Sequence, residues 1–259
     1  MQTVAESIYD HPRYYDLIFG SDWVAEYRFL TEVFDQHVRG KTRRLLEPAC
    51  GTGRLMFRML KAGYHCEGLD LNEKAVEFCN ARLRRHGFRE TAWVGDMCNF
   101  IVAKPFDAAF NTINSFRHLL SEDLARAHLR CVAEALRKGG IYVLGLHLTP
   151  TEGTPLTEES WSARRGHLGI ITRLETFETN LRKRAERCRM TMDVYSPTEQ
   201  FQLVDELVFR TYTLPQMQKL FGEVPELQVA EVYDFRYRID QPTELAADTQ
   251  DVVFILQKQ

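Results

Sequence analysis

Residues 45–54, LLEPACGTGR, constrain the fold most, because an apolar strand there ends in an acid and passes directly into a turn of small residues. A second apolar stretch, YHCEGLD, ends in another acid, Asp70. Small residues in the turn let the backbone approach a ligand closely, since a Cβ atom would collide with it. The N–H groups that open the following helix face the same place. This pattern predicts the nucleoside-binding half of a doubly wound α/β fold.

The details of the turn separate one nucleoside ligand from another. A dinucleotide site needs GxGxxG, in which the third glycine lets the helix pack closely against the strand. Here Gly51 and Gly53 are followed by Arg54, leucine and methionine, so the third glycine is missing. Glu47 precedes the turn, where a carboxylate would repel a pyrophosphate but suit a cationic nucleoside that carries an amino acid. The pattern therefore argues against NAD.

Four further segments follow the first motif, EPACGTGR, in a fixed order: GLDLNEKAVEFC, VGDM (94–97), FDAAFNTINSF (106–116) and LRKGGIYVLGL (136–146). Together, over roughly residues 44–147, the five segments resemble the motifs of the class I S-adenosylmethionine-dependent methyltransferases. Ala49 departs from the pattern, since many members have glycine there, but alanine is the mildest such change. The resemblance implies S-adenosylmethionine as cofactor and S-adenosylhomocysteine as product.

The resemblance also implies roles for single residues. Asp70 would accept hydrogen bonds from both ribose hydroxyls, Asp96 would hold the adenine amino group, and the Met97 backbone would meet the ring edge. The turn of small residues would lie against the methionine portion of the cofactor. Asn111 could meet the cofactor's amino group or the substrate. The full set of predicted cofactor contacts is Tyr15, Glu47, Ala49, Gly51, Gly53, Arg54, Asp70, Leu71, Asp96, Met97 and Asn111.

Several of these residues also have a purely structural interpretation. Tyr14 and Tyr15 could offer a hydroxyl to the cofactor's carboxylate, or they could be buried rings of an amphipathic helix. Arg54 could meet the same carboxylate or face solvent. Asp96 and Asn111 could be an ordinary turn aspartate and a polar strand end.

Methyl transfer asks little of the protein, because the sulfonium is already a good leaving group. In-line alignment of two reactants can supply roughly 7–11 kcal/mol of barrier reduction. A general base adds about 10²–10⁴-fold, and only if a proton must leave the acceptor. His118 and His147 are the catalytic candidates, because both lie after strand ends, where ligands bind in open α/β sheets. The alternative is that each is a structural histidine.

The predicted function is methyl transfer to a nitrogen or oxygen of a small-molecule acceptor. The expected helical cap and later β-layer also resemble the layout of sugar-amine and glycine N-methyltransferases. Two alternatives stay open. The acceptor could be RNA or protein, or the chain could be a non-catalytic nucleoside-binding or interaction protein on the same fold.

Hydrophobic periodicity divides the chain into three parts. Residues 1–43 are expected to form an N-terminal helical cap, helical over 8–39 and ended by Gly40. Residues 44–149 and 211–259 predict the cofactor-binding core, a doubly wound, mostly parallel sheet of seven strands. Residues 150–210 alternate apolar and polar side chains, which predicts an antiparallel β insertion after the fifth strand that covers the substrate pocket. Within the core we expect strands near 44–48, 64–69, 91–94, 106–111 and 140–147, and helices near 53–62, 73–86, 121–137, 214–222 and in part of 112–120.

Composition and charge limit the classes of partner and the location that we expect for this protein. The formal net charge of −3, and the glutamates around the basic run RKRAERCR (182–189), give no electrostatic argument for nucleic acid. No run reaches the ~18 apolar residues of a membrane span, and no secretory signal is expected. Six cysteines lack metal-site spacing, so no metal is expected and a reduced cytoplasm is the default location. We expect a small-molecule acceptor and a monomer or homodimer.

Overall fold

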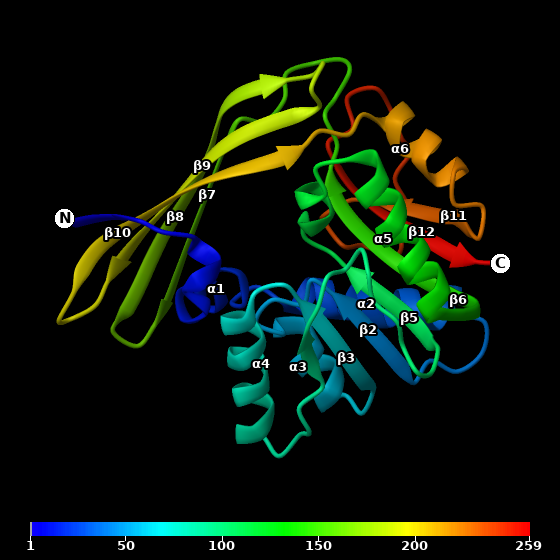
Figure 1. Ribbon diagram of the computed structural model, residues 1–259, viewed down its shortest axis with the longest axis horizontal. Coiled ribbons are helices and arrows are strands. Elements are labelled where there is room, and N and C mark those ends of the chain that lie inside the picture. Colours follow the sequence, from blue (N-terminus) through cyan, green and yellow to red (C-terminus); the bar gives the residue numbers. More distant parts are fainter. Residues whose placement is uncertain (1) are drawn as a thin grey trace.

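The computed structural model describes residues 2–259 and contains two sheets (Figure 1). The larger has seven strands in the order β11-β12-β6-β5-β2-β3-β4. The first five along the chain pair in parallel, and the sixth and seventh add antiparallel contacts at one edge. This confirms the predicted mostly parallel sheet. The bounds are β2 Arg44–Pro48, β3 His65–Asp70, β4 Ala92–Val94, β5 Phe106–Asn111, β6 Leu136–His147, β11 Leu227–Tyr233 and β12 Asp251–Lys258.

Helices cover both faces of this sheet, as a doubly wound fold requires. One face packs against α2 (Val24–His37), α3 (Arg54–Lys61) and α4 (Glu73–Arg85). The opposite face packs against α5 (Glu122–Ala135) and α6 (Leu214–Gly222). Strand β6 supplies both cores, because successive side chains of a strand point to opposite faces. Its Ile141 and Val143 belong to the first core, and Tyr142 and Leu144 to the second.

Local sequence sets the helix boundaries. The Asn72 side chain accepts a hydrogen bond from the Ala75 N–H at 2.9 Å and caps α4, as its position before the helix predicts. Helix α5 ends at Ala135 instead of 137, because Leu136 is extended and already pairs with Phe106. Strand β6 therefore begins earlier than the sequence indicates. The helical part of 112–120 is one short 3₁₀ turn, η2 (Ser115–His118).

The N-terminal region differs from a continuous helical cap. It contains a 3₁₀ turn η1 (Ile8–Asp10), helix α1 (Pro12–Phe19) and then α2, which begins only at Val24. The helical prediction for 8–39 is therefore wrong at the break, where the poor helix formers glycine, serine and aspartate follow α1. Strand β1 (Gln2–Ala5) was not expected, and it pairs in parallel with a strand of the insertion.

The insertion forms the second sheet, in the order β1-β10-β9-β8-β7. Its strands β7 to β10 are antiparallel, as the alternating pattern predicts. One face packs on α1, through a small core that joins Leu17 and Ile18 to Met192 and Leu203. In Figure 1 this sheet stands beside the core, with α1 between them. The bounds are β7 Glu158–Arg165, β8 Leu168–Asn180, β9 Ala185–Tyr195 and β10 Gln200–Arg210.

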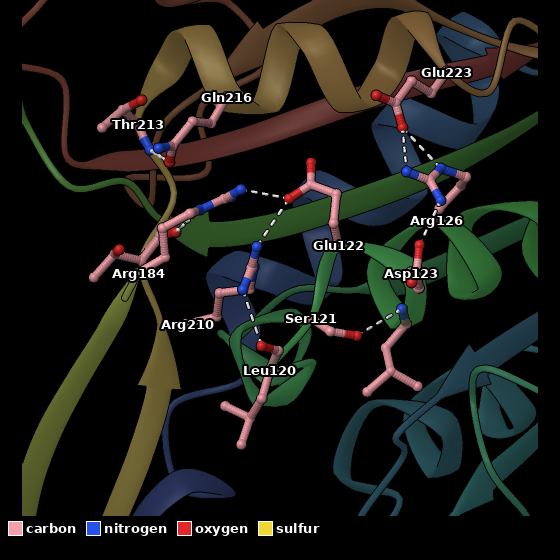
Figure 2. A network of polar contacts seen from close by, with 12 residues as sticks. Leu120, Ser121, Glu122, Asp123, Arg126, Arg184, Arg210, Thr213, Gln216 and Glu223 are labelled. Carbon is pink, nitrogen blue, oxygen red and sulfur yellow. Dashed lines mark hydrogen bonds and ion pairs between the residues drawn. The ribbon is translucent and has the colours of Figure 1, made fainter. Parts of the chain in front are cut away.

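Charged side chains at the base of the insertion anchor it to the core (Figure 2). Glu122, the first residue of α5, accepts a hydrogen bond from Arg210 at 2.9 Å and also pairs with Arg184. Arg210 ends β10, and Arg184 precedes β9. Arg210 also donates to the Leu120 carbonyl at 2.9 Å. One carboxylate of the core thus holds the ends of two insertion strands.

Gly53, which begins α3, combines a left-handed backbone (φ +66°) with close packing, since a Cβ atom there would lie 2.2 Å from Cys79 Sγ. Gly63 is also left-handed (φ +92°), but it has no atom within 4 Å of such a Cβ. We expect Gly63→Ala to cost about 1 kcal/mol through backbone strain. Gly53→Ala should cost roughly 1–3 kcal/mol more, because it also overpacks the core. Urea unfolding of the two variants measures the difference, and equal losses would contradict this packing.

Candidate functional site

A cavity of about 390 Å³ lies at the carboxyl ends of the parallel strands. The loop after β2, the residues after β3 and β4, and turn η2 form its inner wall. The N-terminal segment and the insertion complete the enclosure, with Tyr9, Tyr15, Phe19 and Trp161. The cavity thus occupies the position where open α/β sheets bind their ligands.

The Asp70 carboxylate organises the inner wall. Its Oδ2 accepts the Gly51 N–H and its Oδ1 accepts the Asn72 N–H, both at 2.8 Å. Burial raises the pKa of Asp70, against the effect of the two backbone hydrogen bonds. A carboxylate oxygen has two lone-pair directions, so each oxygen can accept one more hydrogen bond. Asp70 lines the cavity and is therefore placed to bind paired hydroxyl groups.

The turn after β2 brings backbone to the same wall. Ala49 (φ +53°) and Gly51 (φ +52°) both adopt the left-handed conformation, and both line the cavity. For alanine this conformation costs roughly 1–2 kcal/mol. Gly53 does not line the cavity, because it faces Cys79. The predicted turn therefore contributes two of its three small residues to the cavity wall.

Glu47 and Arg54 do not line the cavity. Glu47 is buried, and its Oε2 accepts the Met56 N–H at 3.0 Å, which holds the first turn of α3 against β2. Burial raises the pKa of Glu47 to about 8. The guanidinium of Arg54 is bound by Glu26 of α2 at 2.7 Å and is neither solvent-facing nor directed to the cavity. This geometry gives no support to the predicted contact between Arg54 and a cofactor.

The residues predicted at the adenine end separate into two groups. Leu71 and Met97 line the cavity, and Leu71 is 71% exposed although it is apolar. Asp96 is exposed outside the lining, where its Oδ1 accepts the Cys98 N–H at 2.8 Å. Asn111 is buried below the cavity and donates to the Pro48 carbonyl at 2.8 Å. Leu71 and Met97 are thus the predicted residues that the cavity exposes to a ligand at this end.

Helix α1 is fixed on the glycine turn by a buried acid. Asp16 accepts a hydrogen bond from the Thr52 hydroxyl at 3.0 Å and pairs with Arg82 of α4. This contact places Tyr15 in the cavity wall, where burial raises its pKa to about 12. Tyr14 instead packs against Phe201 of the insertion.

The two candidate histidines both line the cavity, but their surroundings differ. His118 Nε2 is 3.0 Å from the Tyr9 hydroxyl, and burial lowers the pKa of His118 to about 4. This imidazole is therefore neutral at pH 7 and weakly basic. Nothing in the sequence indicates that Tyr9 contacts His118, because Tyr9 belongs to a 3₁₀ turn far from His118 in the chain.

His147, the last residue of β6, is held by contacts on several sides. Its Nδ1 lies 2.7 Å from Oδ1 of Asp251, the residue opposite it in the antiparallel register with β12. The backbone N–H of His147 donates to the side-chain oxygen of Asn114 at 2.8 Å, and the His147 ring packs edge-on against Phe235. A proton shared between Nδ1 and the carboxylate leaves Nε2 as the acceptor nitrogen.

A second cavity, of about 230 Å³, lies beside the first, between the core and the insertion. Glu159 of β7 and His147 line both cavities. Sequence reasoning did not identify Glu159, because nothing in the alternating pattern of β7 distinguishes it from the other glutamates of the insertion.

Three arginines of the basic run 182–189 pair with glutamates of the protein. Arg184 pairs with Glu122, Arg187 with Glu178 and Glu206, and Arg189 with Glu206. Among residues 2–259, no cluster of three or more His, Cys, Asp or Glu could hold a metal ion. No helix of the same residues is long and apolar enough to cross a membrane.

Comparison with known proteins shows what the core of this chain is similar to. Residues 45–140 match the family model described as "Methyltransferase domain". The chain is 30% identical over 141 residues to the Streptomyces venezuelae dTDP-3-amino-3,4,6-trideoxy-alpha-D-glucopyranose N,N-dimethyltransferase, covering 52% of this chain and 56% of that protein. It spans about half the length of the curated relatives it matches.

Solved structures share the fold over almost the whole chain. A crystal structure of an S-adenosylmethionine-dependent methyltransferase from Clostridium acetobutylicum superposes with a TM-score of 0.77 at 15% identity, covering 96% of this chain and 97% of that one. Streptomyces venezuelae DesVI gives a TM-score of 0.75 at 20% identity, with 94% and 97% covered. These similarities confirm the expected class I fold, including the insertion.

Glu47 gives a pH-dependent prediction. Its pKa in the folded protein, about 8, is above that of an unfolded glutamate, so the folded state binds more protons between about pH 4.5 and 8. The contribution of Glu47 to the free energy of unfolding is therefore highest at acid pH and falls as the pH rises through this range. Glu47→Gln keeps an acceptor for the Met56 N–H and removes the titration.

One pKa unit corresponds to about 1.4 kcal/mol of free energy. As the pH rises to 8, the free energy of unfolding of Glu47→Gln should therefore increase by a few kcal/mol relative to that of the unchanged protein. Urea unfolding of both proteins across this range measures the gain. Glu77→Gln, a change on the exposed surface of α4, is the control. Parallel pH profiles for the Glu47 pair would show that Glu47 ionises normally in the folded protein.

Proposed function

We propose that this chain, whose residues 45–140 carry a methyltransferase domain on a class I fold, transfers a methyl group from S-adenosylmethionine to a nitrogen or oxygen of a small molecule. The observation that carries the proposal is the position of Asp70. Its carboxylate lines the cavity at the end of β3, and both its oxygens retain a free acceptor direction.

The larger cavity fits this cofactor in size and in the chemistry of its walls. Its volume of about 390 Å³ is in the ordinary range of small-molecule sites. Asp70 would accept the ribose hydroxyls, and the exposed apolar surface of Leu71 would receive the adenine ring. Ala49 and Gly51 present backbone and at most one methyl group, which leaves room for the methionine portion.

The bound cofactor supplies a methyl group already activated for displacement by its sulfonium. The chain has to exclude water and orient the acceptor, and the aromatic side chains of the N-terminal segment and insertion supply an apolar wall for this. His147 is placed to accept a proton from the acceptor at Nε2, since Asp251 engages Nδ1. His118 is a weak base, because burial lowers its pKa to about 4.

Two observations support a small acceptor over RNA or protein. Three arginines of the basic run, Arg184, Arg187 and Arg189, are paired with glutamates, so they offer less charge to a phosphate backbone. The relative from Streptomyces venezuelae is named as a dimethyltransferase of an amino sugar, which favours nitrogen as the accepting atom.

Calorimetry with S-adenosylmethionine and S-adenosylhomocysteine tests the cofactor assignment. We expect micromolar binding of both and no binding of NAD. Asp70→Ala should abolish binding, because it removes two charge-assisted hydrogen bonds of roughly 1.5–3 kcal/mol each. Asp123→Ala, at an exposed aspartate of α5, is the matched control. Retained affinity in folded Asp70→Ala protein would reject the assignment of Asp70 to the ribose hydroxyls. Absence of cofactor binding to the unchanged protein would reject the proposed methyltransferase activity.

Replacing His118 and His147 one at a time distinguishes a role as general base from a role in cofactor binding. His147→Ala should leave cofactor affinity unchanged and lower kcat by about 10²–10⁴-fold for an acceptor that must lose a proton. His118→Ala should have a smaller effect on kcat, because its imidazole is a weak base. S-adenosylhomocysteine release with a panel of small amines and alcohols measures kcat. A tenfold loss of cofactor affinity in either variant would assign that histidine to binding.

A further inference from the structure

The second cavity adjoins the first, and five residues line both. A ligand in the second cavity therefore lies beside the imidazole of His147, which is one of these five residues. The shared wall consists of Asn114, His147, Glu159, Leu174 and Phe209. If the proposed cofactor fills the larger cavity, the second cavity is the space that remains for the methyl acceptor, which has to contact the cofactor at this wall.

Glu159 is the carboxylate of this wall without a partner. It makes no hydrogen bond or ion pair within the described part of the chain, residues 2–259. Burial raises the pKa of Glu159, so a cation beside it would be favoured as a partner. The other carboxylates around the second cavity have partners: Arg117 for Glu186, Arg173 for Glu158 and His147 for Asp251.

An arginine in the lining of the second cavity is already engaged. Arg117 is buried, pairs with Glu186 and donates to the Arg210 carbonyl at 3.1 Å. The rest of the lining is mixed, since Leu174 and Phe209 supply apolar surface and Thr176, Thr179 and Gln250 supply polar groups. The space therefore combines one acid that has no partner among the described residues with paired charges, uncharged polar groups and apolar surface.

We infer that the second cavity receives the methyl acceptor and that Glu159 selects an amine in its cationic form. This inference rests on the proposed function, because it assumes that the larger cavity holds the cofactor. An ammonium placed between Glu159 and His147 has an ion-pair partner on one side and a proton acceptor on the other. An alcohol of the same shape offers neither the charge nor the number of donors.

The test is calorimetry on protein saturated with S-adenosylhomocysteine, using cyclohexylamine and cyclohexanol as probes of equal shape. A primary alkylamine, like the lysine side chain with its pKa of about 10.4, is cationic at neutral pH. We expect cyclohexylammonium to bind at least about tenfold more tightly than cyclohexanol, as a hydrogen bond to a charged group allows. Glu159→Gln should remove this preference while the affinity for S-adenosylhomocysteine stays unchanged.

Glu175→Gln is the matched control, because it removes the same charge from an exposed position on β8 that lines neither cavity. It should keep the preference for the amine. Equal binding of the two probes to the unchanged protein, or an unchanged preference in Glu159→Gln, overturns the inference. Failure of the proposed function is recognised separately, since S-adenosylhomocysteine would then not bind at all.

Discussion

The structure depends most on the carboxylate of Asp70, which adds side-chain hydrogen bonds between two chain segments that follow the neighbouring strands β2 and β3. By accepting the N–H groups of Gly51 and Asn72, it holds the turn after β2 against the start of α4. The two hydrogen bonds use one acceptor direction on each oxygen and leave the other toward the cavity. The same side chain therefore shapes the inner wall and remains able to bind a ligand.

Buried acids play a similar part for the outer wall. Asp16 of α1 reaches the Thr52 hydroxyl, and Glu26 of α2 holds Arg54 at the start of α3. A buried charge requires a partner, and removing one partner leaves the other uncompensated at a cost of about 3–5 kcal/mol. The N-terminal helices are thus bound to the glycine turn through specific pairs, and this positions Tyr15 over the cavity.

Sequence patterns predicted the parts of this protein that depend on neighbours along the chain. The strand ending at Asp70, the cap at Asn72 and the alternating strands of the insertion all follow from local periodicity and residue type. The contacts made by distant segments could not be read in this way. Asp251 meets His147 only through the register between β12 and β6, and Arg54 is turned from the cavity by an acid on another helix.

Strand β1 has a consequence for how the protein is assembled. Its residues pair with Phe201 to Val204 of β10, so an early part of the chain completes a sheet with a strand made some 200 residues later. Contacts between such distant segments require closure of a long loop before they contribute stability, which slows folding. During synthesis the glycine turn and its neighbouring strands can therefore form first. The enclosure of the cavity has to wait for the insertion, because its outer wall needs strand β10 as well as strand β1.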